Sequence, residues 1–266
     1  MKKIIFTFSM GLLLPAAHAQ QKQGRVVYER TVQLQMRMQG MGDGEEHVLP
    51  RSRKDKLEVL FGNDKSLRRT LEDETPDEEG EGGGMKIRMF VAGGNDVSFV
   101  NFATGQVVEQ REFAAKNYII ADSIHKLNWK LTGETTTILT YPCQKAVTQR
   151  ISKRMTMSME NGQMKKEEVA DTANIIVWFS PSIPVPAGPE YQGQLPGLIL
   201  GIDISNGRTV YKAIEVSDKV DVSAVKEPSK GKKVTADEFA KERNKMMEEM
   251  QRNNGGRGQT IRINAQ

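Results

Sequence analysis

Residues 198–216 have the sequence LILGIDISNGRTVYKAIEV, and this stretch decides the fold. Asn206-Gly207 is the strongest short signal for a tight hairpin turn, because both residues tolerate the positive φ that such a turn needs. Strand-forming residues stand on both sides of the turn, over 198–204 and 208–216. The stretch therefore predicts two neighbouring antiparallel strands.

The same pattern continues outward along most of the chain. Apolar and polar residues alternate over Val32–Met38, which is the period of a strand with one face on a core. Three further turn signals separate strand-like stretches: Asn161-Gly162, Gly93-Gly94-Asn95 and Ala103-Thr104-Gly105. Because no long helical pattern lies between the strands, we expect a mainly β fold, an antiparallel meander that forms a curved sheet or half-barrel.

One helix is predicted near the C-terminus. Thr235 followed by Glu238 is a capping-box start, and apolar residues then recur at roughly helical spacing as far as Met250. We expect a helix over residues 236–252 that packs on the sheet. Residues 254–266 are expected to form a flexible tail, because asparagines and glycines end the helical pattern.

The N-terminus has the three parts of a secretory signal peptide. A basic start and an apolar run over residues 4–14 precede small residues suited to cleavage between Ala19 and Gln20. The sole cysteine, Cys143, is far from that position, so we expect no lipid anchor. No later stretch is long enough to span a membrane. The sequence thus predicts an exported protein of the periplasm or outer membrane, with residues 1–19 removed.

Composition and charge exclude several classes of function. The 266 residues carry 38 Lys and Arg against 34 Asp and Glu, and the formal charge of +4 is too small to suggest a nucleic-acid partner. A single cysteine excludes an intramolecular disulfide and a cysteine-based zinc site. Residues 20–253 are expected to form a single β-rich domain, in which the acidic, glycine-rich residues 72–84 form a mobile loop.

Residues 118–200 contain a series of short motifs in order. They run from YIIAD at 118–122 through Trp129, YPCQKA at 141–146 and WFSPSIPV at 178–185 to GQLPGLIL at 193–200. This series resembles the GLPGLI family of exported Bacteroidota proteins, also called the Porph_ging type. The matching motif residues are Tyr118, Asp122, Trp129, Cys143, Lys145, Trp178, Pro184, Gly188, Pro189, Leu195, Pro196, Gly197, Leu198 and Ile199. Gln194 stands where the signature has its first glycine.

The resemblance implies a β-rich exported protein whose relatives often accompany outer-membrane transport systems, and it implies no general enzymatic activity. We therefore expect a non-enzymatic protein without a cofactor, which binds a hydrophobic ligand or an envelope partner. An envelope enzyme that uses a pair of carboxylates is the alternative, because such a pair leaves no sequence signature.

The signature residues also have a direct physical interpretation. Four prolines between 181 and 189 prevent a helix, so residues 180–190 are expected to form a stiff extended connection. Pro196-Gly197 predicts a tight turn in which Gly197 accepts positive φ, ahead of a buried strand that starts at Leu198. This favours a rigid structural corner. The alternative is a rigid rim for a hydrophobic ligand or a partner segment.

Few residues suggest catalysis. His125 follows Asp122 by three residues, so the two side chains could meet on a helical turn, which more often forms a surface hydrogen bond than a catalytic pair. No nucleophile elbow, phosphate-binding glycine loop or zinc-protease motif is present. Cys143 lies in a strand-like stretch, where a buried and unreactive thiol is expected.

The methionines raise one metal hypothesis. Met155, Met157 and Met159 alternate with polar residues before the turn at Asn161-Gly162. Thioethers are soft ligands that suit Cu(I), so these three side chains are a speculative copper site. The favoured interpretation is that they form the apolar face of a strand, in a core or in an adaptable groove.

Overall fold

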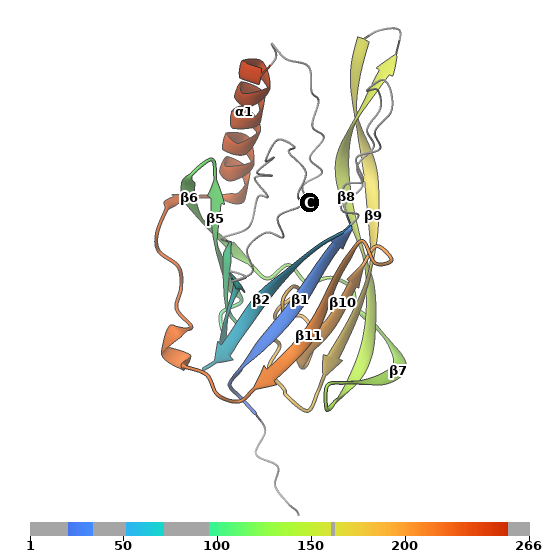
Figure 1. The fold of residues 1–266 in the computed structure, drawn as a ribbon, viewed down its shortest axis with the longest axis vertical. Coiled ribbons are helices and arrows are strands. Elements are labelled where there is room, and N and C mark those ends of the chain that lie inside the picture. Colours follow the sequence, from blue (N-terminus) through green and yellow to red (C-terminus); the bar gives the residue numbers. More distant parts are fainter. Residues whose placement is uncertain (1–20, 34–51, 72–95, 161–162, 255–266) are drawn as a thin grey trace, which may run out of the picture.

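The computed structural model describes residues 21–33, 52–71, 96–160 and 163–254, and within these ranges the strands form one sheet (Figure 1). The strands are β1 Gly24–Gln33, β2 Ser52–Gly62, β3 Lys65–Leu71, β4 Val97–Asn101, β5 Gln106–Phe113, β6 Lys116–Ser123, β7 Lys130–Ile138, β8 Tyr141–Glu160, β9 Gln163–Ser180, β10 Leu198–Ile204, β11 Thr209–Ser217 and β12 Lys232–Val234. A short 3₁₀ helix, η1 (Val222–Ala224), and one α-helix, α1 (Ala236–Asn254), complete the described elements.

The strand order is β12-β6-β5-β4-β3-β2-β1-β11-β10-β9-β8-β7. Strands β1 to β6 form one antiparallel meander and β7 to β11 a second, and the two meet where β1 pairs with β11. The edge strands β12 and β7 do not pair with each other, so the sheet stays open. The prediction of a mainly antiparallel, curved sheet is confirmed, with one addition: β12 joins β6 in parallel.

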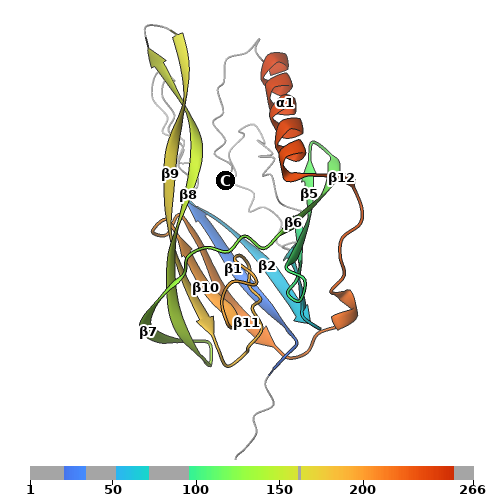
Figure 2. The ribbon, with the colours of Figure 1, turned by 180° about the vertical axis from the view of Figure 1, so that it is seen from behind.

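The two meanders are connected by residues 124–129, which carry the chain from β6 to β7 across one side of the sheet (Figure 2). Residues 181–197, between β9 and β10, lie on the same side, which we call the inner face. The sequence predicted a simple meander because its turn signals are local, whereas this crossing depends on how the two sheet halves pack.

Two of the predicted hairpin turns lie among the described residues, and both form where the sequence predicts them. Asn206 and Gly207 have φ of 56° and 86°, the left-handed conformation for which these residue types are suited. The β10–β11 connection is longer than a two-residue turn, because Ile204 pairs with Thr209. At the β4–β5 turn the Asn101 side chain accepts a hydrogen bond from the backbone N–H of Ala103 at 3.1 Å.

The core divides between the two faces of the sheet, as the alternation of strand side chains requires. In β2, Leu57, Val59 and Phe61 belong to the large inner-face core, while Leu60 belongs to a smaller cluster with Val225 beside η1. The stretch at the start of β10 is fully covered, since Leu198, Ile199 and Leu200 expose 1% or less of their surface. The inner face therefore carries most of the hydrophobic core.

Helix α1 begins as predicted and ends two residues later than predicted. The Thr235 backbone N–H donates to Glu238 Oε2 at 2.9 Å, and the Glu238 N–H donates to Thr235 Oγ1 at 3.2 Å, which is a complete capping box. Phe239 packs edge-on against Tyr118 of β6, with ring centroids 5.1 Å apart. These contacts confirm the predicted packing of the helix on the sheet.

Several predictions fall outside the described residues: the signal peptide at 1–19 with its cleavage position at Gln20, the acidic loop at 72–84, the turns at 93–95 and 161–162, and the tail from residue 255. The strand predicted over Val32–Met38 is described only as far as Gln33, the end of β1. In the described part of the chain, no helix has the length and apolar character needed to cross a membrane.

Candidate functional site

The inner face is filled by the chain itself. Ile183, Ala187 and Leu195 are each at most 4% exposed and belong to the same core as the inner-face side chains of β1 and β2. The hydroxyl of Tyr28 donates to the carbonyl of Ile199 at 2.6 Å, which links β1 to the start of β10, directly after this segment. The proline-rich connection therefore acts as a plug, which we define as residues 181–197.

Gly197 is required at the plug's corner for a reason that differs from the prediction. The expectation of positive φ is wrong, because Gly197 does not belong to the residues with left-handed backbone. Its N–H donates to the carbonyl of Leu195 at 2.9 Å, around Pro196. A Cβ at Gly197 would lie 2.3 Å from the carbonyl oxygen of Ser180. Close approach of two backbones, rather than an unusual φ, excludes a side chain there.

Gln194, the departure from the family signature, joins the plug to residues 124–129, which we call the crossing segment. Its side-chain oxygen accepts hydrogen bonds from the backbone N–H of Leu127 and the indole N–H of Trp129, both at 3.0 Å. Gly193 beside it has φ of 76°, and a Cβ at that position would lie 2.4 Å from Ile124. Hydrogen bonds and close packing at Gln194 and Gly193 thus hold the plug against the crossing segment.

The structure brings some motif residues together and separates others. Trp129 and the residues from Pro184 to Ile199 meet at the plug. Trp178 alternates with the buried Val177 and Phe179, so it lies on the opposite, outer face. There the ammonium of Lys145 lies 5.8 Å from the centre of the Trp178 ring. The motif therefore does not converge on one site.

Asp122 and His125 do meet, at the end of β6 rather than on a helical turn. His125 Nε2 lies 3.0 Å from Asp122 Oδ1, and both side chains are exposed. Cys143 is buried in β8, and burial raises the pKa of its thiol. Both observations agree with the structural interpretation of these residues, because neither group has the setting of a nucleophile.

Among the described residues, no group of three or more His, Cys, Asp and Glu side chains could hold a metal ion. The hypothesis of a copper site at Met155, Met157 and Met159 concerns side chains outside the described part, so it stays a prediction. The backbone register pairs Met159 with Met164 across the β8–β9 hairpin.

A polar network that the sequence did not reveal lies on the inner face beside the plug. Arg30 Nε donates to Asp55 Oδ1 at 2.8 Å, and the Tyr211 hydroxyl donates to Glu190 Oε1 at 3.2 Å. Arg68 donates to the same Glu190 carboxylate and, at 2.7 Å, to the Pro189 carbonyl. Burial and the Glu190 charge raise the pKa of Tyr211 well above the ordinary range. Its hydroxyl therefore remains a donor at neutral pH.

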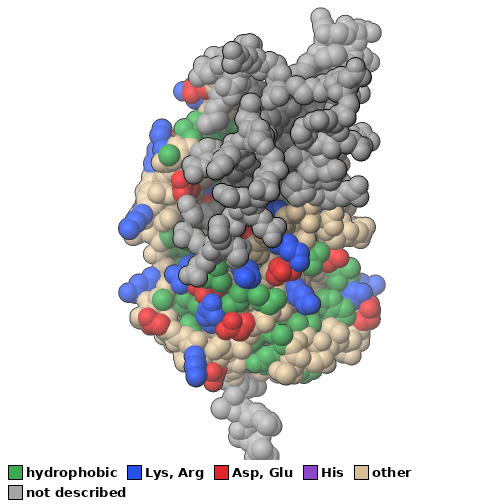
Figure 3. Space-filling model, in the orientation of Figure 1, with side chains coloured by type: hydrophobic (Ala, Val, Ile, Leu, Met, Phe, Trp, Pro, Cys, Tyr) green, Lys and Arg blue, Asp and Glu red, His purple; other side chains and the backbone are tan. Residues whose placement is uncertain are grey.

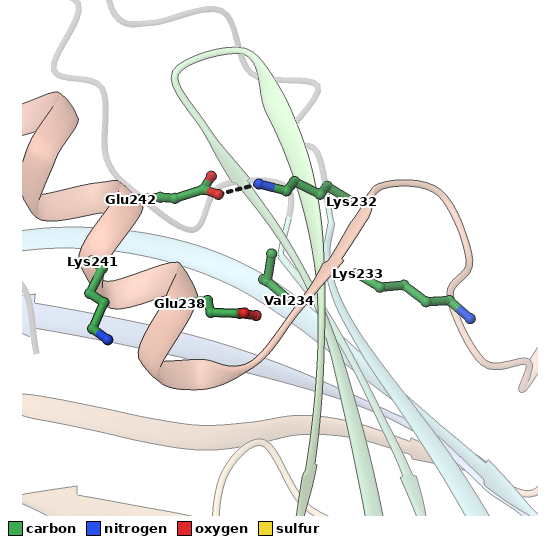
Figure 4. A pocket seen from close by; sticks show the side chains of 6 residues that line it. All are labelled: Lys232, Lys233, Val234, Glu238, Lys241 and Glu242. Atoms are coloured by element: carbon green, nitrogen blue, oxygen red, sulfur yellow. Dashed lines mark hydrogen bonds and ion pairs between the residues drawn. The ribbon is translucent and has the colours of Figure 1, made fainter.

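A hollow of about 280 Å³ lies between β12 and the start of α1 (Figure 4). Its rim is mostly charged, and Lys232 forms an ion pair with Glu242 across it. Glu238, which also lines the hollow, is engaged in the helix cap. This hollow is therefore not the wide apolar cavity that a hydrophobic ligand requires.

The outer face mixes apolar and charged side chains (Figure 3). At its centre the Glu58 carboxylate accepts hydrogen bonds from Arg25 and Arg69, each at 2.6 Å. Burial alone would raise the pKa of Glu58, but these two hydrogen bonds outweigh it and hold the pKa below that of an ordinary glutamate. This cluster couples β1, β2 and β3 on the face away from the plug.

Comparisons with known proteins agree with the fold. Two crystal forms of PNGF-II, in space groups C2 and P21, match with TM-scores of 0.50 and 0.51 at 18% and 17% sequence identity. The matches cover 82% and 84% of this chain but only 32% and 34% of those chains, so it spans about a third of their length. A comparison with curated proteins finds no match. Residues 129–201 match the family model described as protein of unknown function (Porph_ging), so the predicted resemblance to the GLPGLI family is confirmed over that segment.

Proposed function

We propose that this chain is an exported, non-enzymatic protein of the cell envelope that binds a partner protein, such as a component of an outer-membrane transport system. In this proposal the partner adds an extended segment to the long β8–β9 hairpin. The hydrophobic-ligand alternative is disfavoured, because the plug already occupies the apolar inner face.

The observation that carries the proposal is the length of β8 and β9. Strand β7 pairs with β8 only as far as Val147, and β10 pairs with β9 only from Ile175. Beyond these positions, residues 148–160 of β8 and 163–174 of β9 pair only with each other. They form a two-stranded ribbon that projects from the body of the sheet (Figure 1). We call this element the ribbon.

A two-stranded ribbon is marginally stable in water on its own. Its outer edges present backbone N–H and C=O groups that no strand of the described chain engages, and such edges accept added strands. Ile151, near the base of the ribbon, is 74% exposed, which is unusual for a large aliphatic side chain. A partner strand along the ribbon would satisfy the edge groups and cover apolar surface.

Catalysis by a pair of carboxylates is the less supported alternative. The inner-face carboxylates of Asp55, Glu190 and Glu109 are each bonded to an arginine. These ion pairs give the three carboxylates a structural role that needs no catalytic explanation.

The proposal is tested by site-specific photocrosslinking in cells that export the chain. A photoreactive residue at Ile151 is expected to trap a discrete partner band. The matched control is the same photoreactive residue at Ile214, an exposed position on β11 in the body of the sheet. Equal crosslinking from both positions, or none from Ile151, would contradict binding at the ribbon.

A second variant removes the distal part of the ribbon without changing the body of the sheet. Deletion of residues 153–170, with an Asn-Gly turn joining Ser152 to Asp171, keeps the base of the ribbon, where residues 149–152 pair with residues 171–174. We expect this variant to fold, as judged by thermal unfolding, and to lose the crosslinked band at Ile151. Retention of the band would show that the distal ribbon is not needed.

A further inference from the structure

Arg150 lies on the inner side of the ribbon's base, and in the described part of the chain its guanidinium has a buried nitrogen without a hydrogen-bond partner. Its Nε is buried and has no hydrogen-bond partner, and it is the one buried side-chain nitrogen or oxygen of the described residues in that state. Arg150 lies three residues beyond Val147, the last β8 residue that pairs with β7. It therefore lies in the part of β8 that has β9 on one side and no described strand on the other.

Tyr191 of the plug lies close enough to Arg150 for the two side chains to interact electrostatically. Its ring packs edge-on against Trp129, with centroids 5.5 Å apart, and its backbone has φ of 55°. A left-handed backbone is uncommon for a bulky residue and costs on the order of 1 kcal/mol or more, so the surroundings must impose it. Burial raises the pKa of the Tyr191 hydroxyl to about 12 despite the nearby Arg150 charge. The hydroxyl is therefore a donor at neutral pH.

The neighbouring carboxylate of Glu190 is bound by other groups and does not bind Arg150. It accepts from Arg68 and from the Tyr211 hydroxyl, whereas no hydrogen bond joins it to Arg150. Arginine stays charged at all physiological pH values, and a buried donor without a partner is unfavourable. Arg150 and Tyr191 thus present two adjacent donors that an oxyanion would satisfy.

We propose that Arg150 and Tyr191 bind a carboxylate on an acidic side chain of the partner segment that adds to the ribbon. This inference rests on the proposed function and specifies its partner, an extended peptide with acidic residues on one face. Backbone pairing along β8 supplies affinity, and the carboxylate at Arg150 sets which segments bind and in which register.

The test uses two labelled nine-residue peptides, one of alternating valine and glutamate and the other of alternating valine and glutamine. Binding to the purified full chain is followed by fluorescence anisotropy. We expect the glutamate peptide to bind about tenfold more tightly, as one charge-assisted hydrogen-bonded pair allows. Equal affinity for the two peptides would overturn the proposal, and this comparison needs no protein variant.

Protein variants locate the effect. R150Q is expected to abolish the preference for the glutamate peptide, and Y191F to reduce it while keeping the ring against Trp129. K212Q is the matched control, because it removes one exposed positive charge from β11, and it should keep the preference. If K212Q lowers the preference as much as R150Q does, the effect is general electrostatics and the proposal fails.

Two further arms separate this proposal from the proposed function. Free glutamate at millimolar concentration should not displace the peptide, and displacement would identify a small-molecule site in place of a strand. The shortened-ribbon variant should weaken both peptides. If it weakens both while the preference for glutamate is absent in the intact chain, ribbon binding stands and only the carboxylate inference is overturned.

Discussion

The side-chain oxygen of Gln194 lies 3.0 Å from the indole nitrogen of Trp129 and also accepts the N–H of Leu127. This residue replaces the first glycine of the family signature, so the side chain that departs from the signature forms the link between the plug and the crossing segment. Gln194 is thus a structural residue of the inner face in this chain, and not a neutral substitution at the surface.

Q194G restores the signature glycine and should destabilise this chain. The change removes the acceptor of two partly buried donors, and each unsatisfied donor costs about 1–3 kcal/mol. Urea unfolding followed by tryptophan fluorescence should show a lower midpoint. Q194E keeps an acceptor oxygen and should retain most of the stability. An unchanged midpoint for Q194G would show that the link contributes nothing.

G197A should damage folding far more than G201A. A Cβ at Gly197 would lie 2.3 Å from the Ser180 carbonyl oxygen, whereas a Cβ at Gly201 would lie 3.4 Å from its nearest neighbour, a methyl group of Ile138. We expect G197A to lose about 3 kcal/mol or more, in the range of the large effects of backbone displacement and overpacking. G201A should stay within about 1 kcal/mol of the original chain. Thermal unfolding of the two variants makes the comparison.

The turns and the helix could be predicted because their signals are local. Asn206-Gly207 and the pair Thr235 and Glu238 act through neighbouring backbone groups, and the structure uses both as expected. The need for glycine at 197 was predicted with the wrong cause. The true cause is the approach of Ser180, 17 residues earlier in the chain, which no local pattern encodes.

The inner-face polar network could not be predicted for the same reason. Arg68 and Glu190 are 122 residues apart in sequence, and their contact arises only when the plug lies across β3. The sequence around Arg150 contains no motif that distinguishes it from the other polar residues of β8. Only the structure reveals that, among the described residues, the buried Nε of Arg150 has no hydrogen-bond partner.

Glu58 should make the stability of this chain sensitive to acid. Its pKa is lower in the folded chain than in the unfolded chain, so its contribution is present above the unfolded pKa of about 4.3 and is lost as the pH falls through the folded pKa. E58Q should therefore be destabilised at pH 7, by about 1–3 kcal/mol, because two partly exposed arginines lose a charged hydrogen-bond partner.

The difference between E58Q and the original chain should shrink as the pH is lowered below about 4. Urea unfolding at a series of pH values measures this convergence. D221N is the matched control, because Asp221 also has a lowered pKa but its carboxylate is exposed and bonds only to Ser223 nearby. A constant difference between E58Q and the original chain at all pH values would contradict the assigned pKa shift.

F239A should release α1 from the sheet without unfolding the sheet. Phe239 is 7% exposed and packs against Tyr118 at 5.1 Å, beneath the guanidinium of Arg111 at 5.9 Å. The cluster that holds the helix is small and separate from the inner-face core. Loss of the ring can therefore destabilise the protein by no more than the free energy with which α1 docks on the sheet. If the loss is larger than that, the helix detaches and the sheet stays folded.

Hydrogen exchange distinguishes this local release from global unfolding. In F239A, exchange should rise throughout α1 and in β12, which precedes it, while β1, β10 and β11 stay protected. T235A removes only the cap, so faster exchange should be confined to the first turn of the helix, at a cost of about 1 kcal/mol. If F239A instead raises exchange in β10 and β11 as strongly as in α1, the helix belongs to the same cooperative unit as the sheet.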